Sequence, residues 1–194
     1  MSSQVKPEAF FDSISISKKL DDSLDSFKIP EIHLFSYFAS LLFIYKGNSL
    51  DDWNYRFVID KTGYPFSEEL QTAIDRHIKN GLLENRGDFF VITSRGNDEY
   101  SKFKNLPTLI SREQVINAAC TTSILVPYSE AQRALLNDPE LLKAKAVGNN
   151  PWIEHTHVYK KFKEISEAVG APVDDIIIPA VSWINFILQN NFEK

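Results

Sequence analysis

The sequence predicts a mainly α-helical protein that carries one small β-hairpin. Two observations lead to this fold class. Apolar residues recur every three or four positions over most of the 194 residues, which is the period of a helix packed on one side. Between residues 78 and 96 the sequence IKNGLLENRGDFFVITSRG instead ends a helix at a glycine, passes through two short apolar runs around a charged turn, and begins another helix.

The first 47 residues are expected to form two helices. Residues 1–29 are mixed in charge, but their apolar side chains have roughly helical spacing, so we expect an amphipathic helix or arm. A second helix should begin near Pro30, which suits a first helical turn, and end at Gly47, which suits the position after a last turn. Apolar residues surround most of this second helix, and this predicts the central helix of the core.

The predicted sheet follows. Aromatic residues between positions 53 and 57 alternate with polar ones, which is typical of a half-buried strand, and we expect this strand to be the first of the small sheet. A helix capped by Ser67 and ended by Gly81 comes next, then the hairpin and a short helix. The order helix, strand, helix, hairpin, helix is that of a winged helix-turn-helix domain, which we place over residues 30–106.

Residues 107–194 are predicted to be helical again. The last helix, roughly Val173 to Asn190, contains Pro179 and is expected to kink or break there. The expected organisation is therefore an N-terminal arm or helix (1–29), a winged-helix domain (30–106) and a C-terminal helical region.

The central block resembles a known group of proteins. The segments HLFSYFASLLFIYKG, DDWNYRF, YPFSEELQTAIDRHIKNGLLE and FFVITSRG resemble the small winged-helix subunits of prokaryotic SMC/ABC-ATPase-linked defence systems, of the Lamassu type and the related three-component ABC systems. The helix–hairpin part is more distantly similar to PadR-like regulators. The resemblance covers about residues 30–105. It implies a winged helix in a non-catalytic subunit of an anti-phage or anti-plasmid complex, where it would bridge an SMC-like ATPase and a nuclease-type effector.

The charge of the predicted second helix and wing bears on whether this surface contacts DNA or protein. Between Ser67 and Gly96 five acidic residues accompany four basic ones, a sum of -1. Because a carboxylate beside a phosphate repels it, this composition favours protein contact. Arg76, Lys79 and Arg86 could still form a small basic spot, so a dimeric winged-helix transcription regulator that binds DNA stays as the alternative function.

Two other segments are candidate partner-binding elements. In DDIIIPAVSWINFILQNNF apolar residues surround more than one face of the expected helix. Either this helix packs into the chain's own core, or one side, with Trp183, Ile184 and Ile187, docks onto a partner or a second copy. The pair Phe10–Phe11 either contacts a partner or lies on the same domain. In the defence hypothesis the partners are the ATPase and the effector, and DNA is reached through the assembly.

The composition argues against several other classes. The net charge is -5, and the single cysteine, Cys120, excludes an intrachain disulfide and suits a reducing cytoplasm. There is no glycine-rich phosphate loop, and no cysteine or third histidine lies near His155 and His157. No apolar run reaches the ~20 residues that cross a bilayer, and the N-terminus lacks a targeting signal. We therefore expect a cytoplasmic protein that is not an enzyme and has no cofactor or metal.

Overall fold

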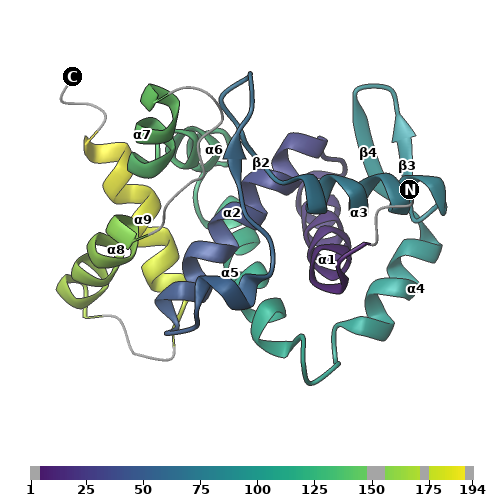
Figure 1. Cartoon of the computed structure of the whole chain (residues 1–194), viewed down its shortest axis with the longest axis horizontal. Helices are drawn as coiled ribbons and strands as arrows, with labels where there is room; N and C mark the ends of the chain where they lie inside the picture. The colour runs from purple at the N-terminus through teal and green to yellow at the C-terminus, as the bar shows by residue number, and fades with distance from the viewer. Residues whose placement is uncertain (1–4, 148–155, 171–174, 191–194) are drawn as a thin grey trace.

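The computed structural model describes residues 5–147, 156–170 and 175–190. Within these ranges the chain forms nine α-helices, one 3-10 helix and two separate two-stranded sheets, which confirms the mainly helical class (Figure 1). In chain order the elements are α1 (Pro7–Leu24), α2 (Ile29–Tyr45), η1 (Leu50–Trp53), β1 (Val58–Ile59), β2 (Pro65–Phe66), α3 (Glu68–Lys79), β3 (Leu83–Arg86), β4 (Phe89–Ile92), α4 (Ser94–Phe103), α5 (Ile110–Leu125), α6 (Tyr128–Leu136), α7 (Pro139–Val147), α8 (Thr156–Ala168) and α9 (Ile177–Asn190).

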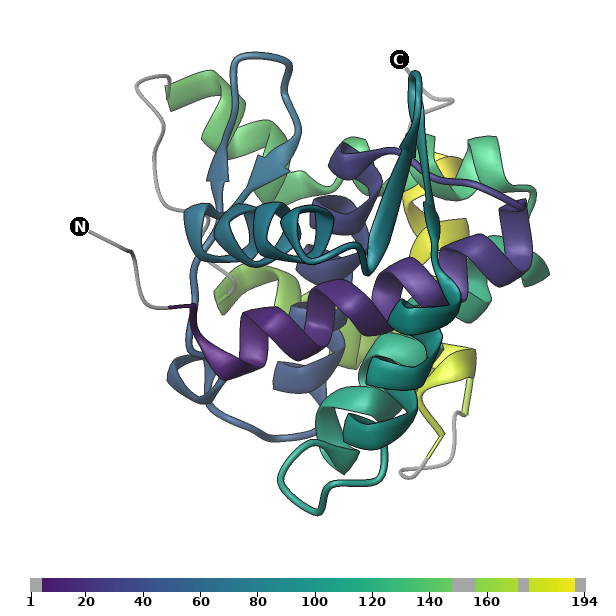
Figure 2. The ribbon, with the colours of Figure 1, turned by 90° about the vertical axis from the view of Figure 1, so that its right-hand side faces the viewer.

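Helices α1 and α2 form the centre of the molecule. Every residue of α2 from Glu31 to Phe43 is buried, as expected for a helix that is apolar on all sides. The predicted N-terminal helix is also present, but it is not a peripheral arm: residues 11–17 are all buried, and α1 contacts α2, α3, α4 and α5 (Figure 2). One cluster of buried apolar side chains includes Phe11, Leu42 and Trp183, so the three segments expected from the sequence share a core.

The expected strand at residues 53–60 is mostly absent. The aromatic side chains are buried and do alternate with exposed polar ones, yet the segment begins as η1 and Asn54 takes a left-handed conformation (φ 67°). Only Val58–Ile59 finds a hydrogen-bonded partner, which is β2, so this strand is not part of the sheet that contains the hairpin. Alternating burial identified an extended segment correctly, but it carries no information about whether a neighbouring strand exists.

The predicted hairpin is formed by β3 and β4, which pair antiparallel from Leu83–Ile92 to Arg86–Phe89. Its turn consists of Gly87 and Asp88, and the side chain of Asn85 accepts a hydrogen bond from the Gly87 amide at 2.9 Å. The other edge of β4 meets the short link between α1 and α2. There Phe27 and Phe90 exchange two backbone hydrogen bonds of 3.0 and 2.8 Å. The hairpin is thereby attached to the two central helices.

The C-terminal helices lie at the end of the molecule opposite the hairpin (Figure 1). The expected break at Pro179 does not occur, because α9 begins only at Ile177 and Pro179 therefore lies in its first turn, where no backbone N–H is needed. The Asp175 carboxylate caps this turn by accepting from the Ile177 amide at 2.8 Å. No helix in the described ranges combines the length and apolar character required to cross a membrane.

Candidate functional site

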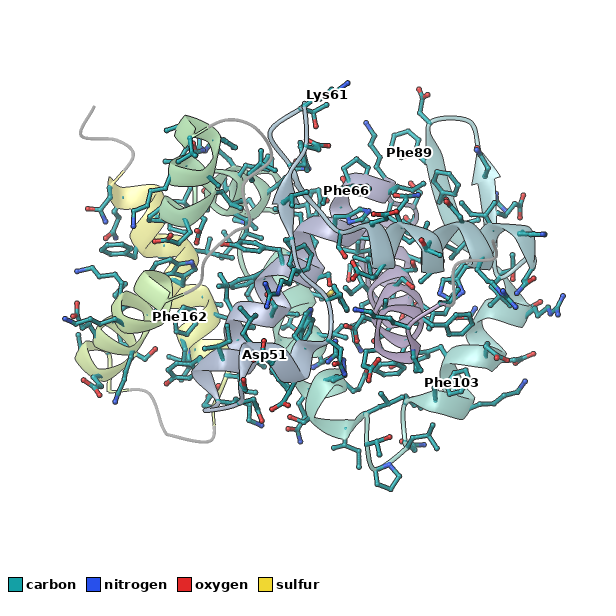
Figure 3. All side chains as sticks on the ribbon, viewed as in Figure 1. Asp51, Lys61, Phe66, Phe89, Phe103 and Phe162 are labelled. Carbon is teal, nitrogen blue, oxygen red and sulfur yellow. The ribbon has the colours of Figure 1, made fainter. Side chains whose placement is uncertain are left out.

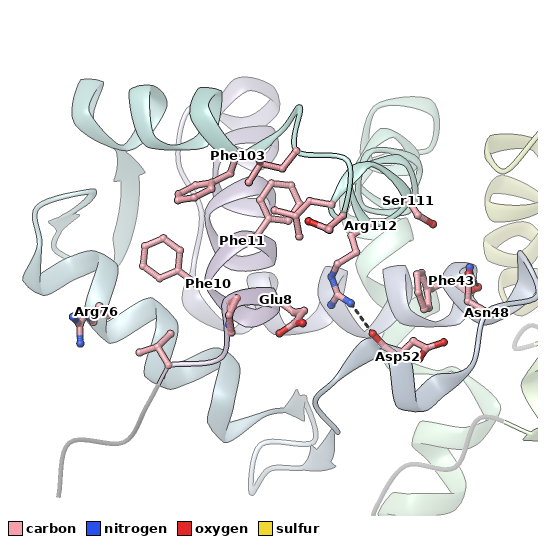
Figure 4. Close-up of a pocket in the computed structure, with 15 residues that line it drawn as sticks. Glu8, Phe10, Phe11, Phe43, Asn48, Asp52, Arg76, Phe103, Ser111 and Arg112 are labelled. Atoms are coloured by element: carbon pink, nitrogen blue, oxygen red, sulfur yellow. Dashed lines mark hydrogen bonds between the residues drawn. The ribbon is translucent and has the colours of Figure 1, made fainter.

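A cavity of about 910 Å³ opens between the start of α1, the end of α3 and the segment that joins α4 to α5 (Figure 4). Sites for small molecules typically have volumes of about 300–1,000 Å³ and mostly apolar walls with a few polar groups. The composition of this cavity agrees with that description. Four phenylalanine rings, three aliphatic leucine or valine side chains and a small number of charged groups line it.

The aromatic wall comes from three helices. Phe10 and Phe11 belong to α1, Phe43 to the last turn of α2, and Phe103 to the end of α4. Phe10 and Phe103 meet edge to face, with ring centroids 6.1 Å apart. Phe11 and Phe43 are buried, whereas Phe10 and Phe103 are only partly buried. The pair Phe10–Phe11 predicted from the sequence as a contact site thus lies at this cavity, with only Phe10 partly accessible.

A buried ion pair forms one side of the cavity. The Arg112 guanidinium of α5 donates from Nε to Asp12 of α1 at 2.9 Å and from one Nη to the other carboxylate oxygen. Tyr55 also donates to Asp12, so the hydroxyl of Ser36, 2.6 Å from that of Tyr55, must act as donor to it. Burial disfavours the charge on Arg112, but the adjacent Asp12 outweighs this and holds the pKa of Arg112 above its ordinary value. Arg112 lies 3.9 Å from the centre of the Trp53 ring.

Two further carboxylates line the same end of the cavity. Glu8, in the first turn of α1, accepts a hydrogen bond from the side-chain amide of Asn54 at 2.8 Å. Asp52, in η1, is exposed, and its backbone oxygen accepts from Arg112 at 3.3 Å (Figure 4). Arg76 lies at the opposite end of the cavity, beyond Phe10. The cavity therefore has an acidic end, formed by Glu8 and Asp52, and a basic end.

The structure places Arg76, Lys79 and Arg86 on the surface, and a carboxylate compensates the charge of one of them, Arg86. All three side chains are exposed. Arg86 in β3 pairs with Glu84 two residues earlier, at 3.3 Å between Nε and the carboxylate. Arg76 faces the rim of the cavity rather than the hairpin.

The hairpin carries an exposed aromatic residue. Phe89, which follows the turn, is 44% exposed, and the ammonium group of Lys28 lies 5.0 Å from the centre of its ring (Figure 3). A large apolar side chain at this position has no role in the core. It is therefore a candidate contact residue that the sequence interpretation missed, because FFVI was taken only as a strand of the hairpin.

The C-terminal residues proposed as partner anchors are instead core residues. Trp183 and Ile184 are fully buried and Ile187 is 2% exposed. Trp183 packs against Phe162 of α8, and its indole N–H donates to the Asp138 carboxylate at 3.2 Å. Of the two alternatives for this helix, the structure therefore has the one in which it packs into the chain's own core, because α5, α6 and α8 cover its apolar faces.

The histidine and cysteine side chains in the interior are buried, and burial shifts their pKa values toward the uncharged forms. Burial lowers the pKa of His33 and of His77 to about 4, so both rings are neutral near pH 7. Each is hydrogen-bonded: His33 accepts from the Ser67 amide at 3.2 Å, and His77 Nε2 lies 3.0 Å from the Phe10 carbonyl. Burial raises the pKa of Cys120 to about 12, which keeps it as an unreactive thiol.

In the described residues no three His, Cys, Asp or Glu side chains gather as metal ligands would. The side chains of His155 and His157 lie outside the described residues.

Arg112 and Asp12 are the residues of this region that the sequence interpretation missed. A signal was present, because Asp12 stands in the run FFDSISI, on the helix that was expected to be amphipathic. An acid in a buried stretch implies a partner, but nothing local indicates which of the 21 basic residues supplies it. The partner is 100 residues away in the sequence.

Comparison with models of protein families, with curated proteins and with solved structures finds no match to this chain.

Proposed function

We propose that this chain is a non-catalytic winged-helix subunit of a multi-subunit bacterial defence complex, in which it bridges an SMC-like ATPase and a nuclease-type effector through protein contacts. The order of the elements supports the winged-helix part. In this hypothesis α1, α2 and α3 are the three helices, Phe27 stands for the short first strand, and β3–β4 is the wing joined to it through Phe90. The domain would then begin at α1 rather than at residue 30, with η1, β1 and β2 inserted between its second and third helices.

The observation that carries the protein-contact role is the surface of α3 and the hairpin. Together with Arg95 at the start of α4, its exposed charges balance: four acids (Glu68, Asp75, Glu84, Asp88) accompany four bases (Arg76, Lys79, Arg86, Arg95). Arg86 pairs with Glu84, and Arg95 donates to the Asn80 carbonyl at 2.9 Å. A phosphate backbone gains little from such a surface. An exposed aromatic side chain such as Phe89 is instead typical of the centre of a protein interface.

The test is an affinity purification of the tagged full-length chain from its native host, with nuclease present and at moderate salt. We expect an ATPase or an effector nuclease to be recovered in stoichiometric amount. Phe89→Ser should reduce that recovery, since it removes the exposed ring from the wing. Leu142→Ser is the matched control, because Leu142 is 41% exposed on α7, at the other end of the molecule. Equal loss in both variants, or no loss in either, would remove the wing as the contact surface.

The alternative is a dimeric DNA-binding regulator, and one observation favours it. Arg76 and Lys79 are exposed on the last turn of α3, the helix that would enter the major groove. Under this alternative the purified chain is a dimer whose affinity for duplex DNA falls steeply with salt, and Arg76→Glu combined with Arg86→Glu abolishes binding. DNA affinity that is absent, or that these changes leave unaltered, contradicts the regulator hypothesis.

A further inference from the structure

The cavity beside α1 has features of a ligand site that the bridging role does not use. We propose that it binds a hydrophobic organic cation, meaning an amine, guanidine or quaternary onium centre carried on an apolar body. This inference does not rest on the defence-complex proposal, because it concerns the cavity of the isolated chain. It stands on three observations: the charge at one end of the cavity, the aromatic wall and the volume.

The charge at the acidic end is negative after the ion pair is counted. Arg112 is the basic side chain at that end, and its guanidinium makes a two-pronged contact with Asp12, so the two charges cancel. Glu8 and Asp52 then leave a net charge of about -2. Glu8 has only the neutral amide of Asn54 as a hydrogen-bond partner, and Asp52 has no ion pair in the described part of the chain.

The aromatic ring of Phe43, near the acidic end of the cavity, favours a cation over a neutral ligand. A positive centre is attracted to the face of an aromatic ring within about 6 Å. The protein already uses this interaction at the edge of the cavity, where the Arg112 guanidinium carbon lies 3.9 Å from the Trp53 ring centre and 5.8 Å from that of Phe43. Phe10 and Phe103 present partly exposed rings on the accessible side, where they can contact the apolar body of a ligand.

The basic end of the cavity determines the orientation of a bound cation. Arg76 lies beyond Phe10, away from Glu8 and Asp52 (Figure 4). A cationic centre is repelled there and attracted at the acidic end, so the charge of the ligand should lie beside Glu8 and Asp52 and its apolar part along Phe10 and Phe103. The volume of about 910 Å³ accommodates such a molecule.

The experiment uses two ions that have the same shape and opposite charge. Tetraphenylphosphonium and tetraphenylborate are titrated separately into the full-length protein by isothermal titration calorimetry at low ionic strength. We expect the phosphonium ion to bind at one site per chain, at least about tenfold more tightly than the borate ion. Glu8→Gln and Asp52→Asn should each weaken phosphonium binding about threefold or more. Phe103→Leu should do the same, because it removes an aromatic contact with the apolar part of the ligand.

Asp98→Asn is the matched control, since Asp98 is an exposed carboxylate on α4 that does not line the cavity. It should leave the affinity unchanged. Thermal unfolding of each variant establishes that it is folded. We expect the Glu8 and Asp52 variants to fold, because Asp52 is exposed and Glu8 is half-buried. Any of four results would overturn the proposal. The two ions could bind equally, the borate could bind more tightly, or neither could bind at millimolar concentration. The fourth is phosphonium binding that Glu8→Gln and Asp52→Asn leave unchanged.

Discussion

At the scale of single residues, the ion pair of Asp12 and Arg112 is the interaction whose disruption we expect to lower stability the most. Asp12 is fully buried and Arg112 is 4% exposed, so both charges are largely removed from bulk water. A buried pair of this kind adds little net stability by itself, because desolvation offsets the attraction between the charges. Its loss is costly for a different reason. Removing one partner leaves the other as an isolated buried charge.

Arg112→Met should therefore lower the free energy of unfolding by about 3–5 kcal/mol, since it strands the Asp12 carboxylate. Urea denaturation at neutral pH measures this. Arg86→Met is the control, because the Arg86–Glu84 pair is exposed and its loss should change stability by less than about 1 kcal/mol. Adding Asp12→Leu to Arg112→Met should restore part of the loss. If the two single arginine variants unfold at the same urea concentration, the pair does not have the structural role assigned to it.

At the scale of elements, the contact between α4 and the hairpin depends on one glycine. A Cβ atom added to Gly96 would lie 2.3 Å from the carbonyl oxygen of Leu82 and 2.7 Å from the side chain of Ile92. The Gly96 amide also donates to the capping hydroxyl of Thr93 at 3.0 Å. The first turn of α4 is thus packed directly against the backbone at the start of β3.

Gly96→Ala should destabilise the protein by about 1–3 kcal/mol, although alanine is the better helix former, because the new methyl group meets a backbone atom that cannot move away easily. Ser101→Ala, at an exposed position of the same helix, should be neutral or slightly stabilising. Thermal unfolding of both variants, followed by circular dichroism, makes the comparison. A higher melting temperature for Gly96→Ala would mean that α4 does not approach the hairpin this closely.

At the same scale, some elements could be predicted from the sequence and others could not. Helix positions followed from apolar periodicity, and the hairpin followed from its turn residues, because both signals are local. The extent of the strand near Trp53 and the position of α1 could not be deduced, since each depends on what lies next to the element in space. The aromatic cavity and the pairing of Asp12 with Arg112 were beyond reach for the same reason: they join α1, α3, α4 and α5 across long separations in the sequence.

At the scale of the whole molecule, Asp138 links helices that lie far apart in the sequence. Its carboxylate accepts hydrogen bonds from the Tyr37 hydroxyl at 3.0 Å and the Trp183 indole at 3.2 Å, and it caps α7 through the Glu140 amide at 2.9 Å. One carboxylate thus contacts α2, α7 and α9. Burial raises its pKa to about 6, and the hydrogen bonds that the carboxylate accepts oppose that rise only in part.

This shift makes stability depend on pH. Because the folded-state pKa of Asp138 lies above its ordinary value of 3.8, the folded protein holds a proton that the unfolded chain releases between about pH 4 and 6. The contribution of Asp138 to stability should therefore be largest below pH 4 and decline as the pH rises to about 6, by an amount on the order of 2–3 kcal/mol. It should be constant above pH 7.

The measurement is the difference in unfolding free energy between the natural protein and Asp138→Asn at several pH values. Asparagine keeps the size of the side chain and does not titrate in this range, so the difference isolates this group from other buried acids such as Asp12. Asp98→Asn, at an exposed site, serves as the reference variant. A difference that stays constant from pH 4 to 7 would contradict the assignment.

The burial of α1 has a consequence for how the protein is made. During synthesis α1 emerges before α5, which supplies much of the surface that covers it, and Arg112 is synthesised 100 residues after Asp12. Until then the nascent chain exposes an apolar helix with an unpartnered acid in its middle, which is a situation that favours chaperone binding or aggregation. We therefore expect that a chain truncated before α5 does not fold, even though it contains α1 through α4 and the complete hairpin.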